Sequence, residues 1–262
     1  MDLKQTLLGV KDSKAWRLLA DFGGLAASAA SVLVIALLII FGLHEVGHGM
    51  ADISWPNCSR LPSIFFERAV IGASGGLDFH PNVCLGKEVR TTAVYGLYAN
   101  TGDPGFPRIK MLGTGPLRCQ DLNCYSFNYG YQAGLYVARQ ARLAAANSPE
   151  WWLDVETVNS WTNSIKANRA DIRGMIAAIS SQTFLRPQIG IYTAANQWVA
   201  IVGHWELKLP LWLGTGATSK AAAAKDCKAA SPTGGKIVLT QYTLSKQDYN
   251  YICSTWAKPK YF

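Results

Sequence analysis

The chain has 262 residues, of which 49% are hydrophobic and 16% are charged, and its formal net charge is +8. This composition excludes a disordered chain, which needs low hydrophobicity and high charge, and the sequence shows neither a coiled-coil heptad nor a collagen repeat. The length fits one large domain or two small ones. The positive charge suits a polyanionic neighbour such as a cell wall, a membrane surface or nucleic acid, but it does not discriminate between them.

A long uncharged stretch covers residues 22–43, and its centre at 32–41 reads VLVIALLIIF. At a helical rise of about 1.5 Å per residue, such a stretch spans roughly 33 Å, which is enough to cross the hydrocarbon core of a bilayer. Four basic residues precede it, so we expect a cytoplasmic segment at 1–21, a transmembrane anchor at 22–43 and an extracytoplasmic remainder. The alternative is a signal peptide cleaved near Gly49–Ala51, which would make the protein secreted.

Six cysteines all follow this apolar stretch: Cys58, Cys84, Cys119, Cys124, Cys227 and Cys253. An even number of cysteines confined to the exported part of a chain indicates disulfides formed in an oxidising compartment. Six cysteines allow fifteen pairings. Economy of loop length favours Cys58–Cys84, Cys119–Cys124 and Cys227–Cys253.

The remainder is interpreted as a juxtamembrane stalk at 44–62 followed by one α/β domain at 63–262. Short β-rich runs are found at 68–73, 94–100, 124–129, 151–156, 188–193, 211–215 and 236–242, with an eighth candidate at 249–253. Helix-like segments lie between several of them, at 131–146, 163–181, 195–202 and 220–225. This alternation predicts a mainly parallel sheet closed as a (β/α)8 TIM-like barrel, preceded by a single N-terminal transmembrane helix. A doubly wound open sheet is the alternative, although no G-x-G-x-x-G follows the first expected strand.

The most informative segment reads WWLDVETVNSW and covers Trp151–Trp161. Asp154 and Glu156 end an apolar strand two residues apart, so both side chains leave the same face, roughly 7 Å apart at the backbone. The carboxyl ends of barrel strands form the catalytic face of such a fold. Two neighbouring carboxylates repel each other, which raises one pKa and creates the general acid that glycoside hydrolysis requires. The alternative is a pair of solvated acids that open a loop.

Five segments, the first of which lies within Trp151–Trp161, carry a resemblance to a known family. The motifs WLDVE, GIYT, LWLGTG, TQYT and QDYNYIC follow one another in this order, and together they resemble the glycoside hydrolase family 25 lysozymes and related exported bacterial glycoside-hydrolase-like barrels. The resemblance covers residues 66–253. It implies cleavage of the β-1,4 bond between N-acetylmuramic acid and N-acetylglucosamine in peptidoglycan. It also implies that Glu156 is the general acid/base, and that Asp154 orients the substrate N-acetyl group in a substrate-assisted attack.

The resemblance further implies a cleft lined by Tyr192, Gln241 and Asp248. The other candidate substrate-binding residues are Asn100, Asn128, Tyr129, Trp161 and Trp212. Aromatic rings stack on the apolar faces of sugars, although Trp152, Trp161, Trp198 and Trp212 are equally suited to core packing. Two departures from the family favour a non-catalytic glycan-binding barrel as the alternative. The strand expected at 68–73 lacks the family's first-strand Asp, and Asn128 stands where related exported proteins tend to carry an acid.

A separate motif, His44-Glu45-Val46-Gly47-His48, matches the zinc-binding pattern H-E-x-x-H and resembles that of membrane-embedded site-2 proteases. A zinc metalloprotease is therefore a third hypothesis. It requires a further ligand, for which Asp78 and His80 are the candidates, and several membrane helices. The sequence contains no P-loop, no G-x-S-x-G elbow and no basic stripe with interleaved aromatics. We therefore expect a cofactor-free glycosidase at the cell membrane, with cell-wall polysaccharide rather than nucleic acid as its partner.

Overall fold

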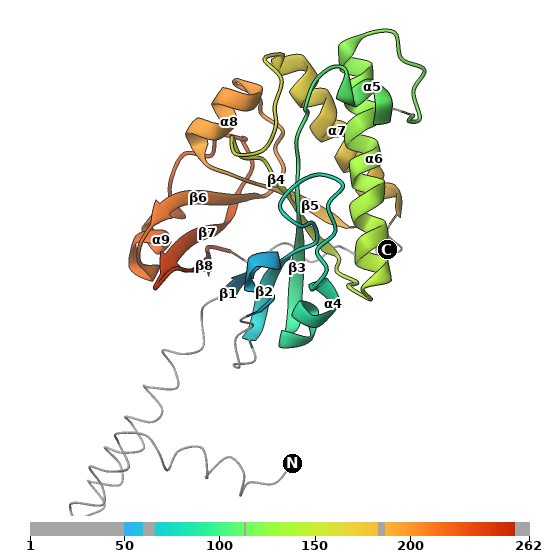
Figure 1. Cartoon of the computed structure of the whole chain (residues 1–262). Helices are drawn as coiled ribbons and strands as arrows, with labels where there is room; N and C mark the ends of the chain where they lie inside the picture. The colour runs from blue at the N-terminus through green and yellow to red at the C-terminus, as the bar shows by residue number, and fades with distance from the viewer. Residues whose placement is uncertain (1–49, 60–65, 113, 183–186, 255–262) are drawn as a thin grey trace, which may run out of the picture. The chain divides into compact units, whose positions relative to one another are not determined.

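The structure, a computed structural model, describes residues 50–59, 66–112, 114–182 and 187–254 (Figure 1). The described residues all belong to one compact unit, which lies within Gly49–Phe262. The expected anchor at 22–43 and the motif with His44 and His48 lie outside the described residues. Within the described ranges, no helix combines the length and the apolar character needed to span a membrane.

Eight strands of the described part close into a barrel in chain order (Figure 1). They are β1 (Met50–Ile53), β2 (Phe66–Gly72), β3 (Thr92–Asn100), β4 (Glu150–Asp154), β5 (Gln188–Thr193), β6 (Leu211–Ala217), β7 (Ile237–Leu244) and β8 (Gln247–Ile252). Neighbouring strands from β1 to β7 run parallel, so the mainly parallel, closed α/β barrel is confirmed.

The last strand departs from the regular (β/α)8 pattern. Strand β8 runs antiparallel to both of its neighbours, β7 and β1. Only Ser245 and Lys246 separate β7 from β8, and both have positive φ values of 52° and 66°. A two-residue turn of this kind reverses the chain directly into a hairpin, which leaves no room for a crossover helix. The reversal brings the first residues of β8 to the edge where the parallel strands end.

The helices and 3₁₀ turns of the described part occupy the connections between the strands (Figure 1). They are η1 (Trp55–Asn57), α4 (Leu85–Glu88), η2 (Val89–Thr91), α5 (Arg108–Leu112), α6 (Leu122–Leu143), α7 (Ile165–Gln182), α8 (Ala195–Val202) and α9 (Lys220–Asp226). The two long helices, α6 and α7, pack against each other along their lengths. The helices expected at 163–181, 195–202 and 220–225 are confirmed.

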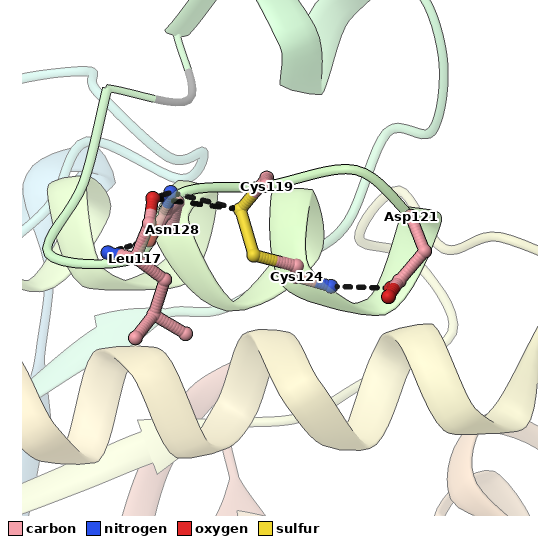
Figure 2. The surroundings of a disulfide bond; sticks show 5 residues. All are labelled: Leu117, Cys119, Asp121, Cys124 and Asn128. Atoms are coloured by element: carbon pink, nitrogen blue, oxygen red, sulfur yellow. Dashed lines mark hydrogen bonds between the residues drawn. A yellow bond between two sulfur atoms is a disulfide. The ribbon is translucent and has the colours of Figure 1, made fainter.

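The strand expected at 124–129 is wrong, because these residues form the beginning of α6. Asp121 is the N-cap of this helix, and its side chain accepts a hydrogen bond from the Cys124 backbone N–H at 3.0 Å (Figure 2). The residues that α6 buries recur every three or four positions, at Tyr129, Ala133, Val137 and Ala141. The aromatic CYSFNY run resembles a strand locally, but the cap and the helical period decide its structure.

The prediction of a stalk over the whole of 44–62 is also wrong, because β1 lies within this range. Ala51 and Ile53 are buried in the cluster that faces the helices, whereas Met50 is buried among residues that come from strands alone. Strand β1 pairs with β2 on one side and with β8 on the other. The barrel therefore includes residue 50, and the strand expected at 68–73 is its second strand rather than its first.

Two layers of apolar side chains hold the barrel together. The inner cluster contains Met50, Val70, Trp152, Trp212, Val238 and Leu239, all from strands. The outer cluster joins the alternate strand residues, such as Trp151 and Leu153, to helix residues that include Trp198. Because side chains alternate along a strand, Trp152 points inward and Asp154 follows it on the same face. Trp152 and Trp198 are fully buried, so they serve the core and not a sugar.

The three disulfides expected from loop length are confirmed. Cys58–Cys84 joins the residue after η1 to the start of α4, and Cys227–Cys253 joins the end of α9 to the residue after β8. Cys119–Cys124 ties the segment before α6 to the first turn of that helix (Figure 2). All six cysteines lie in the described ranges, and none is free.

Candidate active site

A cavity of about 450 Å³ opens where the parallel strands end. It is lined by Asp52, Ser54, Pro56, Asn57, Tyr98, Asp154, Glu156, Tyr192, Trp212, Gln241, Lys246, Gln247 and Asp248. These residues belong to β1, β3, β4, β5, β6, β7 and β8, to η1, or to the positions just after these strands. In a barrel, this edge is the one at which side chains from many strands converge. We refer to this space as the catalytic cavity.

Asp154 and Glu156 line this cavity together, as the two-residue spacing predicts. Asp154 is the last residue of β4 and is 5% exposed. The amide of Asn100, at the end of β3, donates to Asp154 Oδ2 at 2.8 Å. Ser74 Oγ in turn donates to Asn100 Oδ1 at 2.9 Å. Asn100 thus fixes the orientation of a carboxyl group from behind and does not itself line the cavity.

Asp52 supplies an acid on the first strand of the barrel, the position at which the strand expected at 68–73 carries none. It follows Met50 on the inner face of β1 and lines the same cavity as Asp154 and Glu156. Gln241 Nε2 donates to Asp52 Oδ2 at 2.8 Å, and the hydroxyl of Tyr192 donates to Gln241 Oε1 at 2.9 Å. The second departure from the family, Asn128 in place of an acid, does not affect the cavity, because Asn128 lies in α6 and does not line it.

Burial and the charges of neighbouring acids raise the pKa values of Asp52, Asp154 and Glu156. Burial, together with the charges of Asp248 and Glu156, raises the pKa of Asp52 from 3.8 to about 7, although its hydrogen bond from Gln241 opposes this shift. Burial and the nearby charges of Glu156 and Asp52 hold the pKa of Asp154 well above its usual range. Burial also raises the pKa of Glu156. The cavity can therefore retain protons on carboxyl groups at pH values where free carboxyl groups have lost them.

Two residues hold Glu156 in place. The Nε2 amide of Gln197, in α8, lies 3.5 Å from Glu156 Oε1. Gln197 Oε1 accepts the Thr157 backbone N–H at 2.6 Å. The indole N–H of Trp161 donates to the Glu156 carbonyl oxygen at 2.8 Å. Trp161 packs against the outer cluster and is not among the cavity-lining residues. It therefore supports the backbone at Glu156 from outside the cavity.

The expected site residues divide into two groups. Asp154, Glu156, Tyr192, Gln241, Asp248 and Trp212 come together around the catalytic cavity. Asn100, Asn128, Tyr129 and Trp161 do not line it. The Asn128 amide donates to the Leu117 carbonyl oxygen at 2.8 Å and lies 3.1 Å from Cys119 Sγ, so it secures the segment before α6 (Figure 2).

Tyr129 borders a separate, small cavity of about 40 Å³ that Asp78 also lines. Its hydroxyl donates to Asp78 Oδ2 at 3.3 Å. Burial raises the pKa of Asp78 to about 7, and the hydrogen bond from Tyr129 opposes this shift. Asp78 and His80 are the residues suggested as a third zinc ligand. Among the residues that the structure describes, no group of three or more His, Cys, Asp or Glu side chains could hold a metal ion.

The cavity residues that were not expected at the site include Asp52, Tyr98 and Gln247. The signal for Asp52 was present in the alternation of Met50-Ala51-Asp52-Ile53, but the neighbouring apolar stretch obscured this short strand. Tyr98 lies two residues before Asn100 on β3, and the same alternation places it on the inner face. Gln247 donates from Nε2 to the Asp52 carbonyl oxygen at 2.7 Å, a contact that only the β7–β8 hairpin creates.

Comparisons with known proteins identify lysozymes as similar proteins. The family model described as Lysozyme-like protein 1 matches residues 123–226. Two curated relatives from Dictyostelium discoideum, probable GH family 25 lysozymes 4 and 5, are 36% identical over 69 residues and 34% identical over 64 residues. These matches cover 26% and 23% of this chain, and they span only 30% and 29% of the relatives' own lengths. The resemblance to family 25 lysozymes is confirmed.

Solved structures agree with the fold. A muramidase from Acremonium alcalophilum superposes with a TM-score of 0.51 at 17% identity, covering 80% of this chain and 95% of that one. The CTP1L endolysin superposes with a TM-score of 0.50 at 14% identity, covering 78% of this chain and 66% of that one. At these identities the likeness concerns the fold alone.

Proposed function

We propose that the chain is a lysozyme-like glycoside hydrolase that cleaves peptidoglycan. The observation that carries this proposal is the convergence of three acids, Asp52, Asp154 and Glu156, on one cavity at the end of the parallel strands. Acids with raised pKa values and aromatic side chains in one cleft suit hydrolysis of a glycosidic bond. The similarity to family 25 lysozymes supports the same reaction.

In the proposed mechanism, Glu156 donates a proton to the glycosidic oxygen as the bond to the anomeric carbon breaks. The raised pKa of Glu156 favours the protonated form that this step needs. The oxygen of the substrate's own 2-acetamido group then bonds to the anomeric carbon, a substrate-assisted route that some glycosidases follow. Asp154, held by Asn100, orients the acetamido N–H. Glu156 finally removes a proton from the water that opens this intermediate.

The alternative is a barrel that binds glycan without cleaving it. The main reason to consider it was the missing first-strand acid, and Asp52 supplies an acid from β1. Asp52 is joined through Gln241 to Tyr192, so it belongs to the same network as the residues that the resemblance implies. The catalytic proposal is therefore favoured, and binding without cleavage becomes an outcome of the test.

We also propose that the barrel acts outside the cytoplasm. Three disulfides in the described part are typical of an oxidising compartment. The apolar stretch at 22–43 would anchor the chain in the membrane through a single helix, or would be cleaved as a signal peptide. This part of the proposal rests on the sequence and on the disulfides alone.

The test is a product analysis on purified peptidoglycan. The full chain is incubated with peptidoglycan, the new reducing ends are reduced with borohydride, and the reduced sugars are identified by mass spectrometry. A muramidase yields reduced N-acetylmuramic acid in amounts that grow with time. Reduced N-acetylglucosamine alone would indicate cleavage of the other glycosidic bond. Association with peptidoglycan and no new reducing ends would overturn the catalytic proposal in favour of the binding protein.

A further inference from the structure

Exposed basic side chains gather where the parallel strands begin, at the edge of the barrel opposite the catalytic cavity. We call Lys87, Arg90, Arg142 and Lys236 the basic edge, and all four are exposed. We propose that the basic edge is a docking surface for a lipid bilayer that carries anionic headgroups. This inference goes beyond the proposed glycosidase, because no residue of the basic edge lines the catalytic cavity.

The packing of two helix ends brings three of these residues to one place. Lys87 belongs to α4, and Arg90 belongs to η2, which directly precedes β3. Arg142 lies in the last turn of α6. A Cβ atom added to Gly86 of α4 would lie 3.4 Å from the carbonyl oxygen of Ala144, the residue that caps the end of α6. The short helix α4 and the end of α6 therefore adjoin (Figure 1).

Lys236 reaches the same edge from the other half of the barrel. It directly precedes β7, and its carbonyl oxygen accepts the backbone N–H of Leu211, the first residue of β6, at 2.9 Å. Neighbouring strands from β1 to β7 run parallel, so the first residues of β3, β6 and β7 share one edge. Charges spread along an edge in this way suit a broad, flat partner better than a small ligand.

The charges of the barrel are divided between its two edges. The acids that line the catalytic cavity lie where the strands end. Two acids that begin or shortly precede parallel strands are already paired, Glu150 with Arg68 at 2.7 Å and Glu206 with Lys208 at 3.9 Å, and Glu88 of α4 is buried. Within the described ranges, no acid forms an ion pair with a residue of the basic edge. An anionic surface is therefore attracted to this edge and repelled by the other one.

Two exposed apolar side chains accompany the basic edge. Leu143, the last residue of α6, is 70% exposed, and Val94, the third residue of β3, is 55% exposed. Basic residues mixed with exposed apolar side chains are typical of surfaces that rest at a bilayer, where the charges meet lipid phosphates and the apolar groups reach the acyl chains. A soluble anionic polymer would use the charges alone, so these residues favour a bilayer.

A short connection joins the proposed anchor to β1 in the sequence. Six residues, 44–49, separate the apolar stretch at 22–43 from Met50, and a fully extended chain across this gap spans at most about 25 Å. Strand β1 begins at Met50 and runs parallel to β2, so the chain enters the barrel at the edge where the strands begin. An anchor at 22–43 would thus present the basic edge to the bilayer and leave the catalytic cavity accessible to the cell wall. This argument rests on the proposed anchor, whereas the arguments from charge and from apolar exposure do not.

The experiment measures hydrogen exchange of the full chain on two kinds of vesicle. One kind contains phosphatidylcholine alone, and the other contains equal parts of phosphatidylcholine and phosphatidylglycerol. Mass spectrometry follows the segments 84–94 and 139–147, which contain residues of the basic edge, and the segment 154–161, which contains Glu156. A third sample adds inorganic polyphosphate to the protein on neutral vesicles.

Two variants with the same loss of charge are compared with the parent protein. The test variant removes charge from the basic edge through Lys87→Gln, Arg90→Gln and Arg142→Gln. The control variant removes the same charge from exposed residues in or before the first turns of the helices that follow β3 and β4, through Lys110→Gln, Arg118→Gln and Lys166→Gln. Thermal unfolding checks that both variants are folded.

On anionic vesicles we expect exchange in 84–94 and 139–147 to slow by about threefold or more relative to neutral vesicles, while exchange in 154–161 stays the same. Each Lys or Arg near an anionic surface is worth about fivefold in binding, so the test variant should dock about a hundredfold more weakly and lose this slowing. The control variant should retain it. Slowing that persists in the folded test variant, or that is equal on neutral vesicles, overturns the docking surface. Slowing by polyphosphate but not by anionic vesicles also overturns it, in favour of an anionic polymer.

The outcomes separate this inference from the proposed function. A full chain that does not co-sediment with neutral vesicles would contradict the anchor alone, and co-sedimentation with anionic vesicles would then test the basic edge directly. Release of reducing ends from peptidoglycan should be the same for both variants and the parent, since none of the substituted residues lines the catalytic cavity. If no protein releases reducing ends, the glycosidase proposal fails and the docking surface is still decided by hydrogen exchange.

Discussion

Replacing Asp52 by Asn tests whether a partly buried acid in the catalytic cavity destabilises the folded protein at neutral pH. The pKa of Asp52 is raised from 3.8 to about 7, first by burial and then by the charges of Asp248 and Glu156. The folded protein therefore keeps this proton up to about pH 7, whereas the unfolded chain releases it near pH 3.8. Between these two pH values the unfolded chain releases the proton while the folded protein keeps it. The free energy of unfolding therefore falls as the pH rises from 3.8 to about 7.

The size of the effect follows from the shift. Each pH unit of difference is worth about 1.36 kcal/mol, so a shift of about three units gives at most about 4 kcal/mol at pH 7. Asn carries no charge and still offers an oxygen to Gln241 Nε2, which donates to Asp52 at 2.8 Å. We therefore expect Asp52→Asn to be more stable than the parent at pH 7, by up to this amount. At pH 4 the gain shrinks below about 1 kcal/mol.

The assay is urea unfolding of both proteins at pH 4 and pH 7, followed by tryptophan fluorescence with the disulfides intact. The control is Glu206→Gln, since the Glu206 side chain is 73% exposed and is paired only loosely with Lys208 at 3.9 Å. The control should change stability by less than about 0.5 kcal/mol at both pH values. Equal stability of Asp52→Asn and the parent at pH 7 would refute the assignment of Asp52 to a partly buried site with repulsive neighbouring charges.

Three further predictions concern the supports of the site and of the barrel. Asn100→Ala removes the donor to Asp154 Oδ2 and should lower stability by about 1–3 kcal/mol, with a displaced pH–rate profile for glycan cleavage; an unchanged profile would deny Asn100 its positioning role. Glu150→Ala removes both the acceptor of Trp152 Nε1 at 2.9 Å and the partner of Arg68 at 2.7 Å. Denaturant unfolding should show a free energy of unfolding that is lower by about 2–4 kcal/mol. A decrease below about 0.5 kcal/mol would contradict these contacts. Replacing Cys227 and Cys253 by Ser removes a disulfide between residues 26 positions apart and should lower the free energy of unfolding by about 3.5 kcal/mol. Replacing Cys119 and Cys124, which are 5 positions apart, should lower it by about 2 kcal/mol. The reverse order in thermal unfolding would contradict the loop-entropy argument.

Much of the barrel could be predicted from the sequence, because most strands carry a local signal. Strands such as β4 and β5 are dense apolar runs between helical segments, and their burial on both faces produces that pattern. The two-residue spacing of Asp154 and Glu156 predicts a shared face, and both line the cavity although β4 ends at Asp154. The disulfides follow from loop length in the same local way.

The wrong predictions concern segments whose local sequence pattern is masked by a neighbouring segment or overridden by helix capping and tertiary packing. Strand β1 has four residues and follows a much longer apolar stretch, so its own pattern could not be separated from that of the expected stalk. The start of α6 has strand-like aromatic residues, but the Asp121 cap and packing against α7 make it helical. Expecting Asn128 and Tyr129 in the cleft followed from that error.

Some contacts within the site have no sequence signal, because tertiary structure alone brings the two residues together. Gln247 reaches Asp52 across 195 positions of the chain, and it does so because a two-residue turn returns β8 to the rim. Gln197 reaches Glu156 from a helix, 41 positions away. Neither contact repeats with a period or forms a motif, so both become visible only when the barrel is closed.

The most direct test of the central claim is the rate at which purified peptidoglycan loses turbidity and gains reducing ends, measured for the parent protein and for Glu156→Gln at equal concentration. The parent should release reducing ends steadily. Glu156→Gln should lower that rate by at least about a hundredfold, the low end of what a general acid/base contributes, while its thermal unfolding stays close to that of the parent. A folded Glu156→Gln protein that cleaves peptidoglycan at the parent rate would contradict the assignment of the reaction to this cavity.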